Sequence, residues 1–123
     1  MEKSSVTVLQ HDTDVARSLD RMLRNHFHFV RMSTSQDELR KAVATDPPSA
    51  VILDIELAHL DDVENLHRDF PMLPIVCTHR LPDEEIWTAA LNAGASDVCP
   101  TYDMQSVVTS VLRNVAGTRD AAA

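Results

Sequence analysis

Lysine, glycine, aromatic residues and long apolar runs are all scarce in this sequence of 123 residues. The two glycines exclude a glycine-rich phosphate-binding loop. The lysines are Lys3 and Lys41 alone, and 19 acidic against 11 basic residues give a net charge of −8, which argues against binding to nucleic acid or to an anionic membrane. Cys77 and Cys99 form no Cys-x-x-Cys pair, as expected in a reducing compartment. No apolar run approaches the roughly 20 residues of a membrane span, and no apolar leader follows Met1, so we expect a cytoplasmic protein.

Two kinds of segment alternate along the chain. Short runs rich in β-branched residues predict strands at 6–9, 27–32, 50–53, 74–77 and 97–99. Apolar residues at helical spacing follow each run; Ser35 opens the second helix, Asp61 or Asp62 the third, and Gly94 and Gly117 end the last two. Strict alternation predicts an α/β fold with a parallel sheet covered by helices on both faces. We expect one domain over 1–117 and a short tail at 118–123.

Polar side chains stand directly after the apolar runs. The carboxyl ends of parallel strands meet at one edge of the sheet, which is where ligands bind in doubly wound folds. Asp12 and Asp54 supply the oxygen ligands that Mg²⁺ prefers, and Thr78 offers a hydroxyl to an anion beside that ion. The candidate site residues at this edge are His11, Asp12, Asp54, Glu56, Thr78, His79, Thr101 and Tyr102.

Four blocks of sequence resemble the receiver domain of two-component response regulators. They lie at 8–12, 51–55, 74–78 and 93–97, and the resemblance extends over residues 5 to about 116. The resemblance implies a flavodoxin-like (βα)5 doubly wound sheet with strand order 2-1-3-4-5. It also implies a phosphorelay function, in which a sensor histidine kinase or a phosphotransfer protein supplies the phosphoryl group.

The resemblance assigns roles to individual residues. Asp54 stands at the position of the phosphoacceptor, and Thr78 at that of the switch hydroxyl. Mg²⁺ would be held by Asp12, Asp54 and the backbone carbonyl of Glu56, with His11 in place of the first acid of the usual pair. Imidazole is a poorer ligand than carboxylate for a hard cation, so we expect weak Mg²⁺ binding.

Other positions depart from the receiver pattern. No lysine follows Lys41, so the usual active-site lysine is absent; Thr101 stands at its place, or Cys99–Pro100 in a gapped alignment. Arg80 is a candidate substitute cation, and the bulky His79 is placed to narrow access to the site. Phosphoryl transfer depends on positioning and charge neutralisation, so these changes predict an atypical receiver.

Two functions therefore stay open at this point. Asp54 accepts a phosphoryl group and switches a partner-binding face, or the chain is a phosphorylation-independent pseudo-receiver that binds a partner. A third hypothesis places Zn²⁺ between His11, His79, Asp12 and Asp54 in a hydrolytic site. This hypothesis lacks an evident general base, and we expect a protein that is not an enzyme.

A partner face is predicted around Trp87. Trp87 and Leu91 lie one turn apart and off the predicted core stripe of their helix, which indicates a contact surface. The resemblance adds the fifth strand and the last helix to this face, with Val98 in place of the usual switch aromatic and Tyr102 nearby. The predicted occupant is a protein partner, and a homodimer is possible.

Overall fold

The computed structural model describes residues 4–122, and the side chains of residues 4–118. Five strands alternate with five helices in this part of the chain, as the sequence predicts. The elements are β1 (Ser5–Leu9), α1 (Thr13–Leu23), β2 (Phe29–Ser33), α2 (Gln36–Thr45), β3 (Ala50–Asp54), α3 (Leu60–Asp69), β4 (Ile75–His79), α4 (Glu84–Ala93), β5 (Asp97–Pro100) and α5 (Met104–Ala122).

The strands form one parallel sheet in the order β2-β1-β3-β4-β5. This confirms the flavodoxin-like (βα)5 arrangement and its strand order 2-1-3-4-5. The chain reverses its direction of strand addition between β1 and β3, so the loops after these two strands diverge and leave a crevice at the carboxyl edge. The register pairs Leu9 with Leu53 and Asp54 with Thr78, which brings the ends of β1, β3 and β4 together at that crevice.

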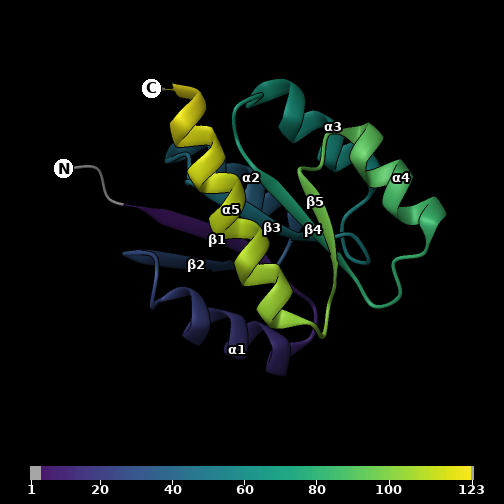
Figure 1. Cartoon of the computed structure of the whole chain (residues 1–123), viewed down its shortest axis with the longest axis horizontal. Helices are drawn as coiled ribbons and strands as arrows, with labels where there is room; N and C mark the ends of the chain where they lie inside the picture. Colours follow the sequence, from purple (N-terminus) through teal and green to yellow (C-terminus); the bar gives the residue numbers. More distant parts are fainter. Residues whose placement is uncertain (1–3, 123) are drawn as a thin grey trace.

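Helices cover both faces of the sheet (Figure 1). Alternate residues of β3 face opposite sides: Ala50 and Ile52 pack in the core under α1 and α5, whereas Val51 and Leu53 pack under α2, α3 and α4. All four are fully buried. A central strand covered on both faces has no polar side, which explains its continuous apolar run.

The sequence predicts N-cap residues for α2 and α3, and the structure confirms the first but not the second. Ser35 accepts from the main-chain N–H of Glu38 and caps α2, as predicted. The predicted caps of α3 are wrong, because His59 is its N-cap residue. Asp62 instead accepts from the main-chain N–H of His59, and Asp61 lies in the first turn.

Two predicted boundaries differ from the structure. β2 begins at Phe29 and not at residue 27, because Phe27 closes the turn after α1 and buries its ring in the core under α1 and α5. The last helix does not end at Gly117 but continues to Ala122, so residues 118–122 extend α5. In the described part of the chain, no helix is long and apolar enough to span a bilayer.

Gly94 ends α4 in the left-handed region, with φ of 116°. A Cβ atom added there would lie 2.5 Å from Cγ of His67, on the neighbouring helix α3. Gly117 differs on both counts, because it lies within α5 and a Cβ there meets nothing within 4 Å. The two glycines therefore form a matched pair for testing backbone strain.

We predict that Gly94→Ala lowers the free energy of unfolding by about 1–3 kcal/mol, because alanine would be strained at this φ and would collide with His67. Gly117→Ala should raise it by about 0.5–1 kcal/mol, since alanine favours the helix. Urea unfolding of the two variants measures both changes. Equal effects of the two substitutions would contradict the assignment of strain to Gly94.

Candidate functional site at the carboxyl edge of the sheet

Asp54 is the centre of the candidate site. It is the last residue of β3 and is 0% exposed. One carboxylate oxygen, Oδ1, accepts from the main-chain N–H of Glu56 at 2.9 Å. The other, Oδ2, accepts from the main-chain N–H of His11 at 3.0 Å and is also in contact with Nδ1 of the His11 ring. Both oxygens of this buried carboxylate are thus engaged by protein donors.

His11 is the group that covers Asp54. The hydrogen bond to Asp54 is the main cause that raises the pKa of His11 above its ordinary value. The charges of Asp54, Glu56 and Asp12 act in the same direction, while desolvation opposes them. The Asp54 carboxylate therefore favours the protonated form of the His11 ring, in which the two side chains form an ion pair.

Asp12 caps α1 and also forms a hydrogen bond with the β5–α5 loop. Its Oδ1 accepts from the main-chain N–H groups of Asp14 and Val15, and its Oδ2 accepts from the Tyr102 hydroxyl at 3.2 Å. The hydrogen bond from the main-chain N–H of Val15 is the main cause that lowers the pKa of Asp12. The same carboxylate raises the pKa of Tyr102. Asp12 thus joins the β1–α1 loop to the β5–α5 loop.

Gln10 is a site residue that our sequence reasoning missed. Its Oε1 accepts from the main-chain N–H of Asp12 at 3.0 Å, and its Nε2 approaches Thr78 Oγ1 at 3.5 Å. Thr78 is fully buried and lies within β4 rather than after it. The signal that would have revealed Gln10 is a polar residue directly after an apolar strand, at the position before His11 and Asp12.

The remaining loop residues pair among themselves. Arg80 does not reach Asp54; its Nε donates to Glu56 Oε2 at 3.0 Å, and its main-chain N–H donates to the other carboxylate oxygen. Nδ1 of His79 accepts from the main-chain N–H of Leu81 at 3.1 Å. The contacts between Arg80 and Glu56 join the β3–α3 and β4–α4 loops. Arg80 therefore pairs with Glu56 and does not take the place of the absent lysine.

Thr101 lies next to the end of β5 at the position expected for the lysine. Its main-chain N–H donates to the carbonyl of His79, and the residue is fully buried. The hydroxyl has no hydrogen-bond partner in the described structure. A threonine at this position leaves the Asp54 carboxylate without a cationic side chain from β5.

The predicted metal ligands are brought to one edge but are not arranged around a cation. Within residues 4–122, no three His, Cys, Asp or Glu side chains form a group that would hold a metal ion. Oδ2 of Asp54 is occupied by His11, and both oxygens of Asp12 accept hydrogen bonds. The residues therefore do not fit Mg²⁺ in this arrangement, and the His11/His79 set predicted for Zn²⁺ does not assemble either.

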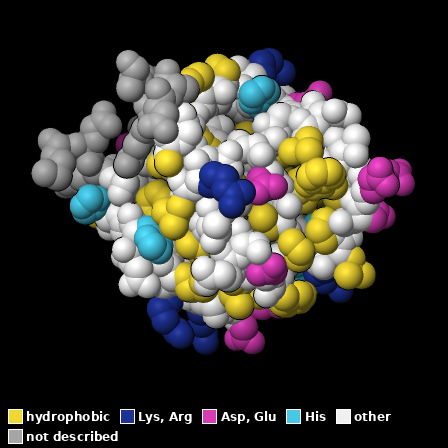
Figure 2. Space-filling view, viewed as in Figure 1, with side chains coloured by type: hydrophobic (Ala, Val, Ile, Leu, Met, Phe, Trp, Pro, Cys, Tyr) yellow, Lys and Arg dark blue, Asp and Glu magenta, His cyan; other side chains and the backbone are white. Residues whose placement is uncertain are grey.

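The residues predicted for the partner face differ in their exposure to solvent. Trp87 is 46% exposed and Tyr102 is 56% exposed. Val98 is only 8% exposed and packs in the core under α4, so its place on the face is wrong: its side chain points inward from β5. Leu91 is half-buried against the same core. Figure 2 shows hydrophobic side chains gathered over α4 and along β5.

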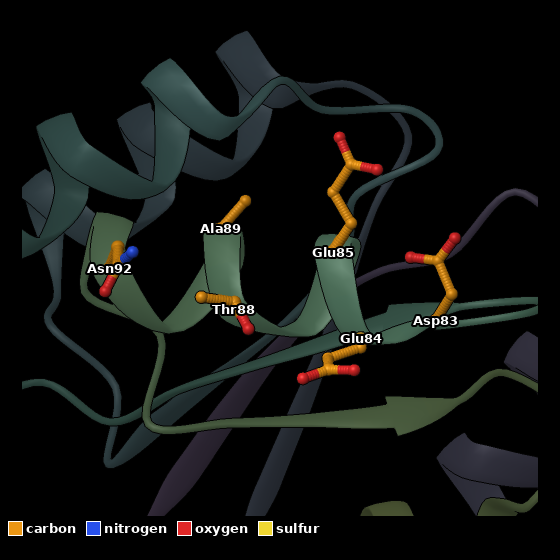
Figure 3. Close-up of a pocket in the computed structure, with 6 residues that line it drawn as sticks. All are labelled: Asp83, Glu84, Glu85, Thr88, Ala89 and Asn92. Atoms are coloured by element: carbon orange, nitrogen blue, oxygen red, sulfur yellow. The ribbon is translucent and has the colours of Figure 1, made fainter.

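A shallow pocket of about 620 Å³ lies on α4, apart from Asp54. Its lining includes the carboxylates of Asp83, Glu84 and Glu85 at the start of the helix (Figure 3). Acidic residues in a first turn interact favourably with the helix dipole, and Asp83 caps α4 by accepting from Ile86. These carboxylates therefore have a structural explanation.

Comparison with known proteins supports the likeness seen in the sequence. No family model matches the chain. Response regulator MprA of Mycolicibacterium vanbaalenii is 29% identical over 101 residues, which cover 77% of this chain and 42% of that protein. A CheY-like receiver domain protein from Methanospirillum hungatei superposes with a TM-score of 0.86 at 15% identity, covering 97% of this chain and 98% of that one.

A response regulator from Chloroflexus aurantiacus gives a TM-score of 0.82 at 23% identity over 94% of this chain and 99% of that one. This chain has the response-regulator receiver fold. The chain spans less than half the length of the curated relative, 42%. The receiver fold explains why Asp54 and Thr78 lie side by side, because β3 and β4 are neighbours in register.

The His11–Asp54 pair predicts a pH dependence of stability. A histidine whose pKa is raised by folding stabilises the protein below its ordinary pKa, and this contribution is lost as the pH rises through the folded-state value. We expect His11→Gln to remove stability near pH 6 but much less near pH 8, by no more than about 1 kcal/mol, because the His11 side chain is 35% exposed and solvent screens the pair.

Urea unfolding of the wild type and His11→Gln at both pH values measures this difference. His26→Gln is the control, because His26 is an exposed histidine after α1 and away from Asp54. Equal losses of stability at both pH values for His11→Gln would contradict the ion pair.

Proposed function

We propose that the chain is an atypical receiver domain that acts in cytoplasmic signalling as a phosphorylation-independent interaction module and not as an enzyme. The observation that supports this function is the state of Asp54: a fully buried carboxylate whose two oxygens accept from His11 and Glu56. The main-chain N–H and the ring of His11 both lie on Oδ2, so His11 must move away before this oxygen can attack phosphorus. No lysine follows Lys41, so no lysine side chain can compensate for the loss of the His11 contacts.

The proposed docking face is formed by α4, β5 and the β5–α5 loop. Trp87 and Tyr102 are the exposed aromatic residues on it, and large aromatic side chains contribute most to binding energy in protein interfaces. The partner that fits the receiver likeness is a sensor histidine kinase, a phosphotransfer protein or another regulator, and a second copy of the chain is a further possibility for this face.

A second candidate function is phosphoryl acceptance on Asp54. It is favoured by the placement of Asp54 at the end of β3, paired in register with Thr78, whose hydroxyl is buried beside it. In this function the Asp54 carboxylate first separates from His11, and one of its oxygens then forms the bond to phosphorus while the donor's leaving group departs.

Incubation with acetyl phosphate and Mg²⁺, followed by intact-mass measurement, separates the two functions. We predict no phosphoryl adduct on the wild type. Beryllofluoride, which mimics a phosphoryl group, should leave Trp87 fluorescence unchanged. Asp54→Asn is the matched control, because it removes the acceptor and keeps the shape of the side chain.

An adduct on the wild type that is absent from Asp54→Asn would overturn the first function and support the second. A phosphorylated phosphotransfer protein tested as donor in the same assay extends the experiment to a macromolecular route. An adduct seen only with that donor would likewise overturn the first function and support the second.

A further inference from the structure

The geometry points to His11 as a built-in replacement for the divalent cation of the site: its ring and its main-chain N–H occupy the Asp54 oxygen that a cation would need. This inference goes beyond the proposed function, because it concerns what neutralises Asp54 and not what the domain binds. It predicts that His11 is the main side chain that keeps Mg²⁺ from Asp54, and that the Tyr102 hydroxyl on Asp12 adds to this effect.

Asp54 is 0% exposed, and a carboxylate taken out of water is destabilised unless it is paired and hydrogen-bonded. His11 supplies two contacts to Oδ2, and the Glu56 N–H supplies one to Oδ1. Within the described residues, His11 is the basic side chain in contact with Asp54, because Arg80 pairs with Glu56.

Both carboxylate oxygens of Asp12 also accept hydrogen bonds from the protein. Its Oδ1 is used to cap α1, and its Oδ2 accepts from Tyr102. Mg²⁺ demands a near-octahedral shell of oxygens and usually takes one or two free carboxylates. Here both candidate carboxylates already carry protein donors, so a cation would have to displace His11 from one and Tyr102 from the other.

The backbone fixes the position of His11 beside Asp54. The residue lies between β1 and the N-cap of α1, and its main-chain N–H is fixed on Asp54. A side chain at this position is therefore directed at the carboxylate by the backbone. Aspartate at the same position would place a second carboxylate beside Asp54 in place of an imidazole ring, and the two negative charges would require a counter-ion.

The test is a titration of the apoprotein with MgCl₂, followed by amide chemical shifts of residues 10–12 and 54–56 and by thermal unfolding. Wild type should show no saturable shift at millimolar Mg²⁺. His11→Asp should bind Mg²⁺ at least about tenfold more tightly and should regain on Mg²⁺ addition the thermal stability that it loses without the ion. His26→Asp, which adds the same charge away from the site, should behave like wild type.

A second variant tests the role of Asp12. Tyr102→Phe removes only the hydroxyl that Asp12 Oδ2 accepts. Combined with His11→Asp, it should tighten Mg²⁺ binding further, because a second carboxylate oxygen is freed. On the wild-type background Tyr102→Phe should leave the protein without a Mg²⁺ response, since His11 still covers Asp54.

Two results would overturn the inference. One is saturable Mg²⁺ shifts at Asp12 and Asp54 in the wild type, a measurement that does not depend on any variant folding. The other is a folded His11→Asp protein that responds to Mg²⁺ no more than His26→Asp does. Neither result bears on the acetyl phosphate assay, so failure of this inference is distinguishable from failure of the proposed function.

Discussion

A carboxylate buried at the end of a central strand constrains this structure more than any other single group. Asp54 lies where β1, β3 and β4 end together, and its environment excludes water. An ionised carboxylate in such a place needs donors on both oxygens. The β1–α1 and β3–α3 loops provide them through His11 and Glu56, so the paths of these loops at the carboxyl edge are tied to the charge of one side chain.

The three residues from Gln10 to Asp12 connect the surroundings of Asp54 with neighbouring strands and loops. Their side chains reach three different strand ends: Gln10 approaches Thr78, His11 contacts Asp54, and Asp12 accepts from Tyr102. A short loop that makes three such contacts joins the ends of β1, β3 and β4 to the loop after β5. It also links the buried site to Tyr102, an exposed residue of the proposed docking face. The site and the surface thus share a hydrogen-bonded connection.

The order and type of the elements followed from the sequence because each has a strong local signal. The apolar run of β3, the Ser35 cap and the Gly94 stop all express local physical preferences, and the structure confirms them. The errors occurred where tertiary packing prevailed over local preference. Phe27 looks like a strand residue but serves the core from a turn, and α5 passes through Gly117 although glycine commonly ends a helix.

The sequence alone determined the receiver fold, the gathering of His11, Asp12, Asp54 and Thr78 at one edge, and the absence of a lysine after Lys41. Strand periodicity and parallel topology suffice for these, since both are properties of backbone direction. Only the tertiary structure decided how these side chains pair: His11 with Asp54, Arg80 with Glu56, and Tyr102 with Asp12. Such pairs join loops that are distant in sequence, and the orientation of each side chain depends on where the other loops place theirs.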